Sequence, residues 1–312
     1  MPPLKYHFGQ LALQTEAKTT LVAEKLAHWV GPVAEFTYGA DLILLAAADA
    51  DGTLHFNVLS GKPPLVEPLN TSAGLCLRLP SGFAGLLSSS TFYGGLVISL
   101  ANARRARING RLVQRAGFTE LESAETFTLC KKYIAPTLAL DDQPHIGPLS
   151  RQPVALDNPW ITALLAKAET AFFASLSPEG RPDVAHRGGP PGFLQLDAAT
   201  KKLSWNEYVG DGIFKSAGNL RATNVMTLLV PDLETGDGLE LVGRGEYQNL
   251  RADRKERLDP LVQHRQDFPI QGGITCEIDR AVRLSQLLHP RRRLEQAVRI
   301  TSRSTASAQA PQ

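Results

Sequence analysis

Apolar and polar positions in the first half of the chain predict one helix followed by several strands. Apolar residues at helical spacing end where Gly31-Pro32 interrupts the pattern. A continuous apolar run, the turn sequence Asp49–Gly52 and an alternating run come next, which is typical of a β-hairpin. The predicted elements are a helix over 11–30 and strands over 42–48, 53–59, 95–100 and 106–113.

The same order of elements returns in the second half, after a polar and proline-rich stretch. Here the pattern predicts a helix over 160–168 and strands over 170–176 and 182–186. The turn glycines Gly52 and Gly180 have nearly the same separation in sequence as Gly110 and Gly243, each of which precedes an arginine. Two landmarks with nearly the same offset indicate an internal duplication.

These elements predict a mainly β architecture with flanking helices. Many short strands, few long helices and glycines at strand bends favour a closed or nearly closed antiparallel barrel in each half. The chain has 312 residues, of which 43% are apolar, so it is long enough for two domains of about 150 residues with a core in each. We expect the two barrels to pack against each other through an apolar face.

Charge and cysteine content narrow the function classes. With 33 basic and 31 acidic residues, the net charge of +2 creates no field that would recruit nucleic acid or an anionic membrane. The basic run 289–293 is expected to be a solvated face. Cys76, Cys130 and Cys276 have no spacing that suits zinc or a disulfide framework, which favours a reducing compartment. Because Met1–Gln10 does not resemble a leader, and no run of about 18 apolar residues occurs, we expect a cytoplasmic protein without a membrane partner.

The glycine-rich segment His186–Phe193 is the first candidate for a binding loop. Arg187 offers a planar, bidentate match to a phosphate or to the carbonyl edge of a ring. Gly188 and Gly189 allow backbone N–H groups to approach an anion or an aromatic plane closely. Such a loop suits a flat, phosphorylated cofactor. The alternative is a tight barrel corner in which the arginine pairs with a neighbouring carboxylate.

A second candidate segment, Trp205–Leu220, follows in the sequence. Lys215 and Ser216 lie near an expected helix start after a glycine turn, where a cation, a hydroxyl and free N–H groups together favour a phosphate. An ordinary capped helix with a solvated lysine is the alternative. Trp205 and Tyr208 have side chains that stack on a ring, although aromatics at strand spacing also form cores.

These segments together carry a family resemblance. The pattern His-Arg-Gly-Gly-x-Pro-Gly-Phe, the pattern Glu-Tyr-x-Gly-x-x-x-Phe-x-Ser-x-Gly-Asn-Leu and the segment Asp232–Asp237 resemble the pyridoxamine 5′-phosphate oxidase-like FMN-binding split-barrel superfamily. Ala103–Arg111 and Cys130–Ile134 resemble the arginine-rich strand and the Cys-Pro-x-Tyr-Ile motif of its tandem, two-copy group. The resemblance covers roughly residues 12 to 250, and it implies two tandem split β-barrels that form an intramolecular pseudo-dimer.

Periodicity, composition and the internal repeat, together with the resemblance, predict a domain division, and the resemblance implies a cofactor site. The division is a leading helical segment (1–35), a degenerate N-terminal split barrel (36–140), a linker (141–160), a C-terminal split barrel with the flavin-site motifs (161–298) and a disordered tail (299–312). Flavin mononucleotide (FMN) would lie between the two halves, with Arg187, Lys215 and Ser216 as phosphate candidates and Arg104 or Arg105 reaching across from the first half. The cofactor-binding residues expected on this basis are His186, Arg187, Gly188, Gly189, Trp205, Tyr208, Lys215, Ser216, Asn219, Arg104 and Arg105.

Departures from the family pattern qualify this expectation. Relatives carry arginine at the position of Gly212, so one basic contact is missing and Asp211 stands beside the gap, which predicts weakened phosphate affinity. Gly61–Leu65 lacks the arginine and the second glycine of the corresponding loop, so no second flavin is expected in the first half. Relatives also have proline where Lys131 follows Cys130, and a single thiol such as Cys130 is usually inert packing.

The resulting hypothesis is an FMN-binding oxidoreductase that moves electrons between a small organic substrate and dioxygen or a nicotinamide. No catalytic acid or base and no metal site is identifiable in the sequence. One alternative is a non-catalytic flavin or haem carrier with a decayed site, for which His186, His264 or His289 would supply the axial ligand. Another is a reductase that uses the deazaflavin F420. The pseudo-dimer is compatible with further homodimerisation.

Overall fold

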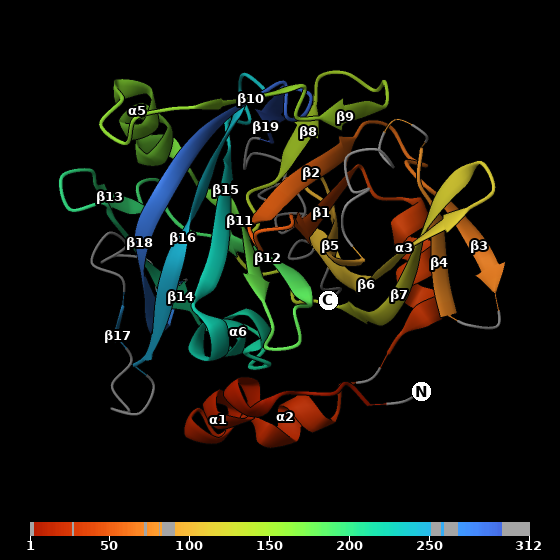
Figure 1. Cartoon of the computed structure of the whole chain (residues 1–312), viewed down its shortest axis with the longest axis horizontal. Helices are drawn as coiled ribbons and strands as arrows, with labels where there is room; N and C mark the ends of the chain where they lie inside the picture. The colour runs from red at the N-terminus through yellow and green to blue at the C-terminus, as the bar shows by residue number, and fades with distance from the viewer. Residues whose placement is uncertain are drawn as a thin grey trace, which may run out of the picture.

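Two antiparallel sheets lie side by side and make up most of the molecule (Figure 1). The computed structural model describes residues 3–26, 28–71, 74–80, 82, 91–250, 257–258 and 268–294. The predicted tail at 299–312 and His264 lie outside these residues. Within them, the predicted fold class, mainly β with flanking helices, is confirmed, and the sheets are not closed into barrels.

The strands of the first sheet come from the first half of the chain. They are β1 (Leu42–Ala48), β2 (Leu54–Ser60), β3 (Glu67–Thr71), β4 (Gly74–Arg78), β5 (Phe92–Ser99), β6 (Arg104–Arg115), β7 (Phe118–Thr128) and β9 (His145–Gly147). The second sheet contains β10 (Ser150–Pro153), β11 (Thr170–Leu176), β12 (Pro182–Gly188), β13 (Gln195–Asp197), β14 (Lys202–Tyr208), β15 (Val225–Pro231), β16 (Gly238–Asn249), β17 (Arg257–Leu258) and β18 (Pro269–Ser285). A separate pair joins β8 (Thr137–Ala139) to β19 (Arg291–Arg293).

The two sheets share one strand order, which agrees with the duplication inferred from the glycine spacing. The first sheet has the order β3-β4-β7-β6-β5-β1-β2-β9. From the corresponding edge, the second has the order β13-β14-β18-β16-β15-β11-β12, with β10 and β17 also paired to β18. Gly110 and Gly243 both lie at register shifts in their sheets. A Cβ atom would meet a backbone oxygen at 1.9 Å at Gly110 and at 2.0 Å at Gly243, so both bulges require glycine.

The N-terminal helices differ from the prediction. A single helix was expected over 11–30, but the structure has α1 (Phe8–Glu16) and α2 (Thr20–Glu24), separated by Lys18 at a positive φ of 57°. Gly31-Pro32 does not stop a helix. It lies in the first turn of α3 (Val30–Tyr38), where the missing N–H of proline has no intrahelical partner to lose.

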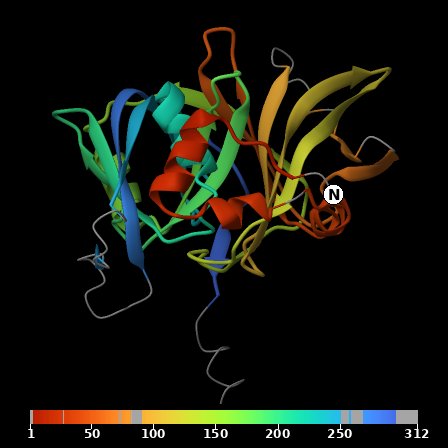
Figure 2. The ribbon, with the colours of Figure 1, turned by 90° about the horizontal axis from the view of Figure 1, so that it is seen from below.

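The remaining helices are α5 (Pro159–Lys167), whose first turn is capped by the side chain of Asn158, and α6 (Lys215–Thr223). Helices α1 and α2 lie across the α6 side of the molecule (Figure 2). A Cβ atom on Gly9 of α1 would lie 2.5 Å from the carbonyl oxygen of Gly218, so these two helices cross at close range. None of the described helices is long and apolar enough to cross a membrane.

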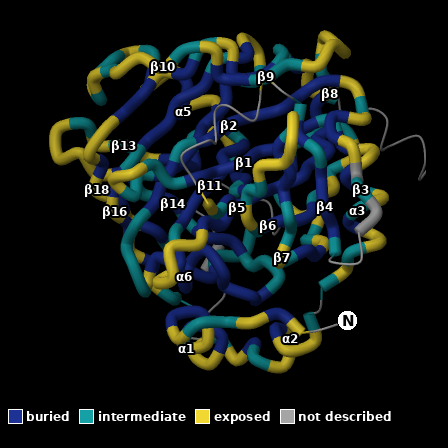
Figure 3. Tube along the Cα trace, turned by 45° about the vertical axis from the view of Figure 1, so that its right-hand side comes forward, coloured by how far each residue is buried: buried dark blue, intermediate teal, exposed yellow. Residues whose placement is uncertain are grey.

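Three large apolar cores hold the two sheets, a smaller one joins the N-terminal segment to β7, and the buried strands fill the centre of the molecule (Figure 3). Each half has a core of its own, and a third core lies between them. Leu44 and Phe56 from the first sheet meet Phe172 and Val184 from the second in this third core, and all four are fully buried. Burial of this apolar surface holds the two halves together. A binding site at their junction therefore has walls in a fixed arrangement.

Within the basic run near the end of the described chain, Arg292 and Arg293 are exposed as expected, but Arg291 is not. Arg291 is buried, and its Nη2 donates to Asp41 Oδ2 at 2.6 Å while its Nε donates to Thr137 Oγ1 at 2.9 Å. Arg293 pairs with Glu169 at 2.8 Å. Arg291 therefore ties the β8–β19 pair to the segment that precedes β1.

Candidate cofactor site at the junction of the two halves

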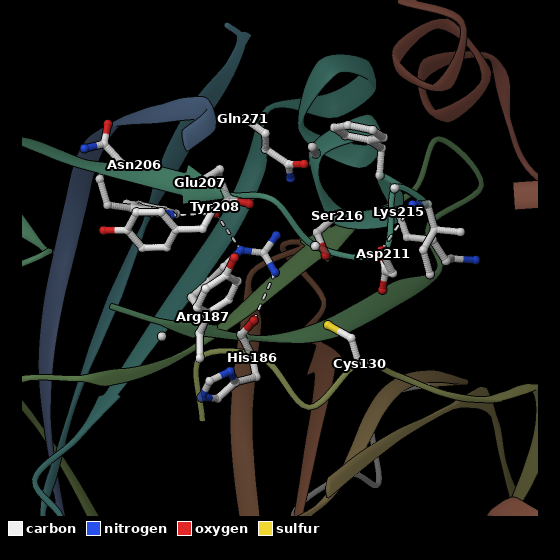
Figure 4. A pocket seen from close by; sticks show the side chains of 18 of the residues that line it. Cys130, His186, Arg187, Asn206, Glu207, Tyr208, Asp211, Lys215, Ser216 and Gln271 are labelled. Carbon is white, nitrogen blue, oxygen red and sulfur yellow. Dashed lines mark hydrogen bonds and ion pairs between the residues drawn. The ribbon is translucent and has the colours of Figure 1, made fainter. Parts of the chain in front are cut away.

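A pocket lies where β12, β14 and the start of α6 meet β6 and the segment that follows β7 (Figure 4). Water-sized molecules have about 100 Å³ of free space in it, and the surrounding space that includes the open mouth is about 770 Å³. The enclosed part is smaller than sites that bury a whole drug-sized ligand, so the pocket suits a ligand that lies partly in its mouth. The lining residues are Arg105, Arg107, Cys130, Tyr133, His186, Arg187, Gly188, Phe193, Trp205, Asn206, Glu207, Tyr208, Gly210, Asp211, Gly212, Ile213, Phe214, Lys215, Ser216, Ala217 and Gln271.

Arg105 of β6 reaches from the first half into this pocket. Its Nη1 lies 2.6 Å from Nδ1 of His186, and its Nη2 donates to Sγ of Cys130 at 3.3 Å. No ion pair joins Arg105 to a carboxylate among the residues that the structure describes. Burial lowers the pKa of this guanidinium, and the neighbouring Cys130 and Asp211 act in the opposite direction. Arg105 is thus a desolvated cation whose charge is available to a ligand.

His186 is a buried, neutral imidazole. Burial lowers the pKa of His186 well below its usual value, and the charges of Arg105 and Arg187 lower it further. A guanidinium only donates, so Nδ1 accepts and the proton of the neutral ring is on Nε2. That Nε2 is buried without a hydrogen-bond partner. The histidine therefore offers a donor at Nε2 and no free lone pair.

The three residues expected to hold a phosphate are already bonded to carboxylates. Nε of Arg187 donates to Glu207 Oε1 at 2.6 Å, as in the alternative of a barrel corner with a paired arginine (Figure 4). The other two make similar contacts. Lys215 Nζ lies 2.6 and 2.7 Å from the oxygens of Glu125, and Ser216 Oγ donates to Asp183 Oδ2 at 2.9 Å.

Asp183, at the start of β12, is the centre of a buried polar network between the halves. Its Oδ1 accepts from Asn109 Nδ2 at 2.8 Å and lies 3.1 Å from Nη1 of Arg107. Burial alone would raise the pKa of Asp183, but Arg107, Lys215 and the hydrogen bonds from Asn109 and Ser216 hold it below its usual range. Asp183 is therefore ionised at neutral pH, and Arg107 keeps one buried Nε without a partner.

The N-terminus of α6 faces the pocket without a side-chain cap, after Phe214 at a positive φ of 54°. The N-terminal helices hold the turn before it from outside, since Thr19 Oγ1 donates to the carbonyl of Gly212 at 2.7 Å and Gln14 donates to that of Ile213 at 2.9 Å. The helix start is thus held in place at the pocket, and N–H groups at a helix N-terminus favour an anion. A solvated Lys215, the alternative considered for this segment, is wrong because Lys215 is buried.

Aromatic side chains line the other side of the pocket. Tyr133, at a positive φ of 62°, stacks on Phe268 with ring centroids 5.3 Å apart, and Tyr208 lies 5.4 Å from Tyr133. Gly188 permits this arrangement, because a Cβ atom there would lie 1.8 Å from the carbonyl oxygen of Tyr133. Trp205 belongs to the core of the second half and donates through Nε1 to Glu207 at 2.7 Å.

The structure brings most of the predicted site residues to one place. His186, Arg187, Gly188, Trp205, Tyr208, Lys215, Ser216 and Arg105 all line the pocket. Three others do not line it: Gly189 packs against Phe193, Asn219 faces His7 and Gln10 of the N-terminal segment, and Arg104 lies over the Phe36 ring at 5.3 Å. Their roles as cofactor ligands stay predictions from the sequence, and of the two candidate arginines the structure places Arg105, and not Arg104, at the pocket.

The lining residues that were not expected to bind the cofactor include Arg107, Tyr133, Glu207 and Gln271. Gln271 Oε1 is buried and has no hydrogen-bond partner. Arg107, Tyr133 and Glu207 stand within segments that the resemblance already singled out, so their sequence signal was available. Gln271 of β18 stands outside these segments, and it reaches the pocket through the pairing of β18 with β14.

The equivalent place in the first half has a different chemistry. Leu42 pairs with Ser60 as Thr170 pairs with Gly188, so Leu59 and Val58 stand where the second half has Arg187 and His186. Leu59 and Val58 are buried and apolar. The first half therefore has no cation and no imidazole at these two positions.

Comparison with known proteins gives matches in structure. No family model matches the chain, and no curated protein matches its sequence. HupZ from Group A Streptococcus matches at 19% identity and a TM-score of 0.30, over 40% of this chain and 90% of that one. A putative pyridoxamine 5′-phosphate oxidase from Lactobacillus delbrueckii matches at 15% identity and a TM-score of 0.26, over 36% and 83%. HutZ from Vibrio cholerae, described as a haem storage protein, matches at 14% and 0.27, over 41% and 93%.

The chain is similar to pyridoxamine 5′-phosphate oxidase-like proteins. At these identities the likeness concerns the fold. Each of these matched proteins is nearly complete in the match but spans less than half of this chain.

Proposed function

We propose that this protein binds a flavin in the junction pocket, with FMN as the form that the motifs favour, and that it is an oxidoreductase acting on a small organic substrate. Dioxygen or a nicotinamide would be the redox partner. The observation that carries the proposal is Arg105, a desolvated cation from one half without a carboxylate partner in the described chain, in a pocket whose other walls come from the other half. A positive charge at the ring edge is how proteins tune a flavin.

The donors and acceptors of the pocket suit the edge of such a ring. A flavin presents both N–H and C=O groups along one edge, and it supplies hydride and electron transfer when bound. Gln271 Oε1 and Arg107 Nε are a buried acceptor and a buried donor without partners, so each would gain a hydrogen bond from a ligand. Arg105 would orient the ring, and Tyr133 and Tyr208 would exclude water from the mouth.

The haem alternative has less support from these residues. Iron needs an imidazole lone pair, and the contact with Arg105 leaves the proton of His186 on Nε2. His289 does not line the pocket, and its Nε2 lies 2.7 Å from the carbonyl oxygen of Gln143. His264, the third candidate, lies outside the described residues. The deazaflavin F420 would meet the same side chains as FMN, so the mass of the extracted ligand separates these two.

The spectrum and the mass of whatever copurifies with the protein test this proposal. We expect the absorbance bands of an oxidised flavin and the mass of FMN or a close relative. A Soret band in place of flavin bands would contradict the proposal. Reduction of the bound flavin, followed by exposure to air or to nicotinamides, then separates the enzyme from a carrier, because a carrier would keep the reduced form.

A further inference from the structure

The phosphate end of the proposed site already contains negative charge from the protein. Lys215 and Ser216 at the start of α6 are the groups that would hold a phosphate ester, and both are turned onto carboxylates. Lys215 is bonded through Nζ to both oxygens of Glu125, with side-chain exposures of 7% and 24%. Ser216 donates its only proton to Asp183, which is almost fully buried.

The charges of the whole cluster balance before any ligand is present. Its cations and carboxylates are Arg105, Arg107, Arg187 and Lys215 on one side and Glu125, Asp183, Glu207 and Asp211 on the other. Three of the four cations are in ion pairs shorter than 3.2 Å. A phosphate ester adds a charge of about −1.5 to −2 at neutral pH. The attraction of Lys215 and of the α6 N-terminus is therefore opposed by repulsion from two carboxylates at the same place.

Of the two carboxylates Glu125 and Asp183, Glu125 is the one that a phosphate ester would have to displace. It comes from β7 of the first half and reaches α6 of the second, where it binds Lys215 and accepts from Asn109 Nδ2 at 3.1 Å. Asp183 is fixed by Arg107, Asn109 and Ser216, whereas Glu125 is the more exposed of the two. Glu125 and Lys215 also line a second cavity of about 750 Å³.

We infer that Glu125 is an internal counter-ion that occupies the phosphate-binding lysine, so that the site recognises the flavin ring and gains little from the phosphate. The inference rests on the proposed function. Riboflavin, which has the ring and no phosphate, then binds with an affinity within about threefold of that of FMN, a difference below about 0.7 kcal/mol. Removal of the charge of Glu125 restores the preference for FMN.

Fluorescence titration of the full chain with FMN and with riboflavin tests this inference. In the wild type we expect a ratio of the two Kd values between about one third and three. In Glu125→Gln, which keeps the shape and the hydrogen bond to Lys215, FMN should gain about tenfold over riboflavin, the size of one charge-assisted hydrogen bond. Glu122→Gln is the matched control, because Glu122 lies on the same strand but pairs with Arg111 and Arg115 outside the junction pocket.

The outcomes separate the inference from the function that it rests on. Wild-type binding of FMN more than tenfold tighter than riboflavin would overturn the inference and leave the flavin site intact. An unchanged ratio in folded Glu125→Gln would also overturn the assigned role of Glu125. If neither flavin binds to the wild type, the proposed function itself fails. The wild-type ratio needs no variant, so misfolding of Glu125→Gln does not remove the test.

Discussion

Arg105 is the residue whose surroundings most clearly call for a ligand. It is desolvated, contacts only a neutral imidazole and a thiol in the described structure, and lines the pocket next to Arg187. A half-buried charge without an ion-pair partner is costly, and proteins keep such groups mainly where they act on something else. The adjacent Arg104 has none of these features, since it is exposed and lies over Phe36.

We expect Arg105→Gln to weaken flavin binding by about tenfold or more, because one charge-assisted contact contributes about 1.5–3 kcal/mol. Titration of flavin fluorescence measures the change. Arg104→Gln is the control, and its affinity should equal that of the wild type. Equal affinities for Arg105→Gln and the wild type would remove Arg105 from the site.

His55, at the other end of the junction, makes the stability of the fold depend on pH. Its Nδ1 lies 3.1 Å from Glu240 Oε1, and its Nε2 lies 3.0 Å from Asp49 Oδ2. The hydrogen bond to Glu240 raises the pKa of His55 against the effects of burial and of Arg151. Protonated His55 therefore stabilises the folded state fully below its unfolded-state pKa of about 6.5. This stabilisation is lost as the pH rises through the higher pKa of His55 in the folded state.

Replacement of His55 by Gln should therefore lower the free energy of unfolding more at about pH 5.5 than at about pH 9. Because His55 is partly exposed, we expect a loss of about 1 kcal/mol at the lower pH. Urea denaturation at both values measures the difference. A loss that is equal at both pH values would show that the charge of His55 makes no contribution.

At the scale of elements, the segment that follows β7 forms one wall of a site whose other walls come from the second half. Tyr133 in this segment has a positive φ, and its carbonyl approaches Gly188 at the end of β12. A methyl group at position 188 would lie 1.8 Å from that oxygen, so the segment would have to move away. The glycine that was expected to approach a cofactor thus also accommodates the protein backbone.

Gly188→Ala should destabilise the protein by about 2–3 kcal/mol, as overpacking against a backbone does. The midpoint of urea denaturation measures it. Gly31→Ala serves as the control, because nothing lies within 4 Å of a Cβ there and the residue is in α3. The control should be unchanged or slightly more stable, and a similar midpoint for both variants would contradict the close approach.

Sequence patterns predicted the elements more fully than the site. The run Leu42–Ala48 and the glycine turn after it specified β1 and its hairpin, because burial and turn geometry are local properties. The break at Lys18 was not predictable, since helical spacing continues through it. Glu125 was not predictable as the partner of Lys215, because 90 residues separate them and only the packing of the two halves brings them together.

At the scale of the whole molecule, the duplication has produced two unequal junctions. The strand registers match Arg107 of β6 with Glu240 of β16, and Asp183 of β12 with His55 of β2. The signs of the charges are therefore reversed between the two junctions. Arg151 of β10 supplies the cation at the second place, where its Nη1 donates to Glu240 Oε1 at 3.0 Å. At the second junction a cation of the protein itself therefore pairs with the buried carboxylate, whereas the first junction contains the pocket.

We therefore expect one flavin per chain. The protein concentration and the absorbance of the saturated complex give the ratio. The apolar Leu59 and Val58 exclude a second flavin at the equivalent place, because neither provides a contact to its ring edge. A ratio of two would show that the first half has retained a site.

Equilibrium titration of the ligand-free protein with FMN, followed by flavin fluorescence, tests the central claim most directly. The claim is that the pocket between the halves, with Arg105 at its wall, holds a flavin. It predicts saturable binding to one site per chain that is weakened by Arg105→Gln and unaffected by Arg104→Gln. An absence of saturable binding to the folded wild-type protein would contradict it.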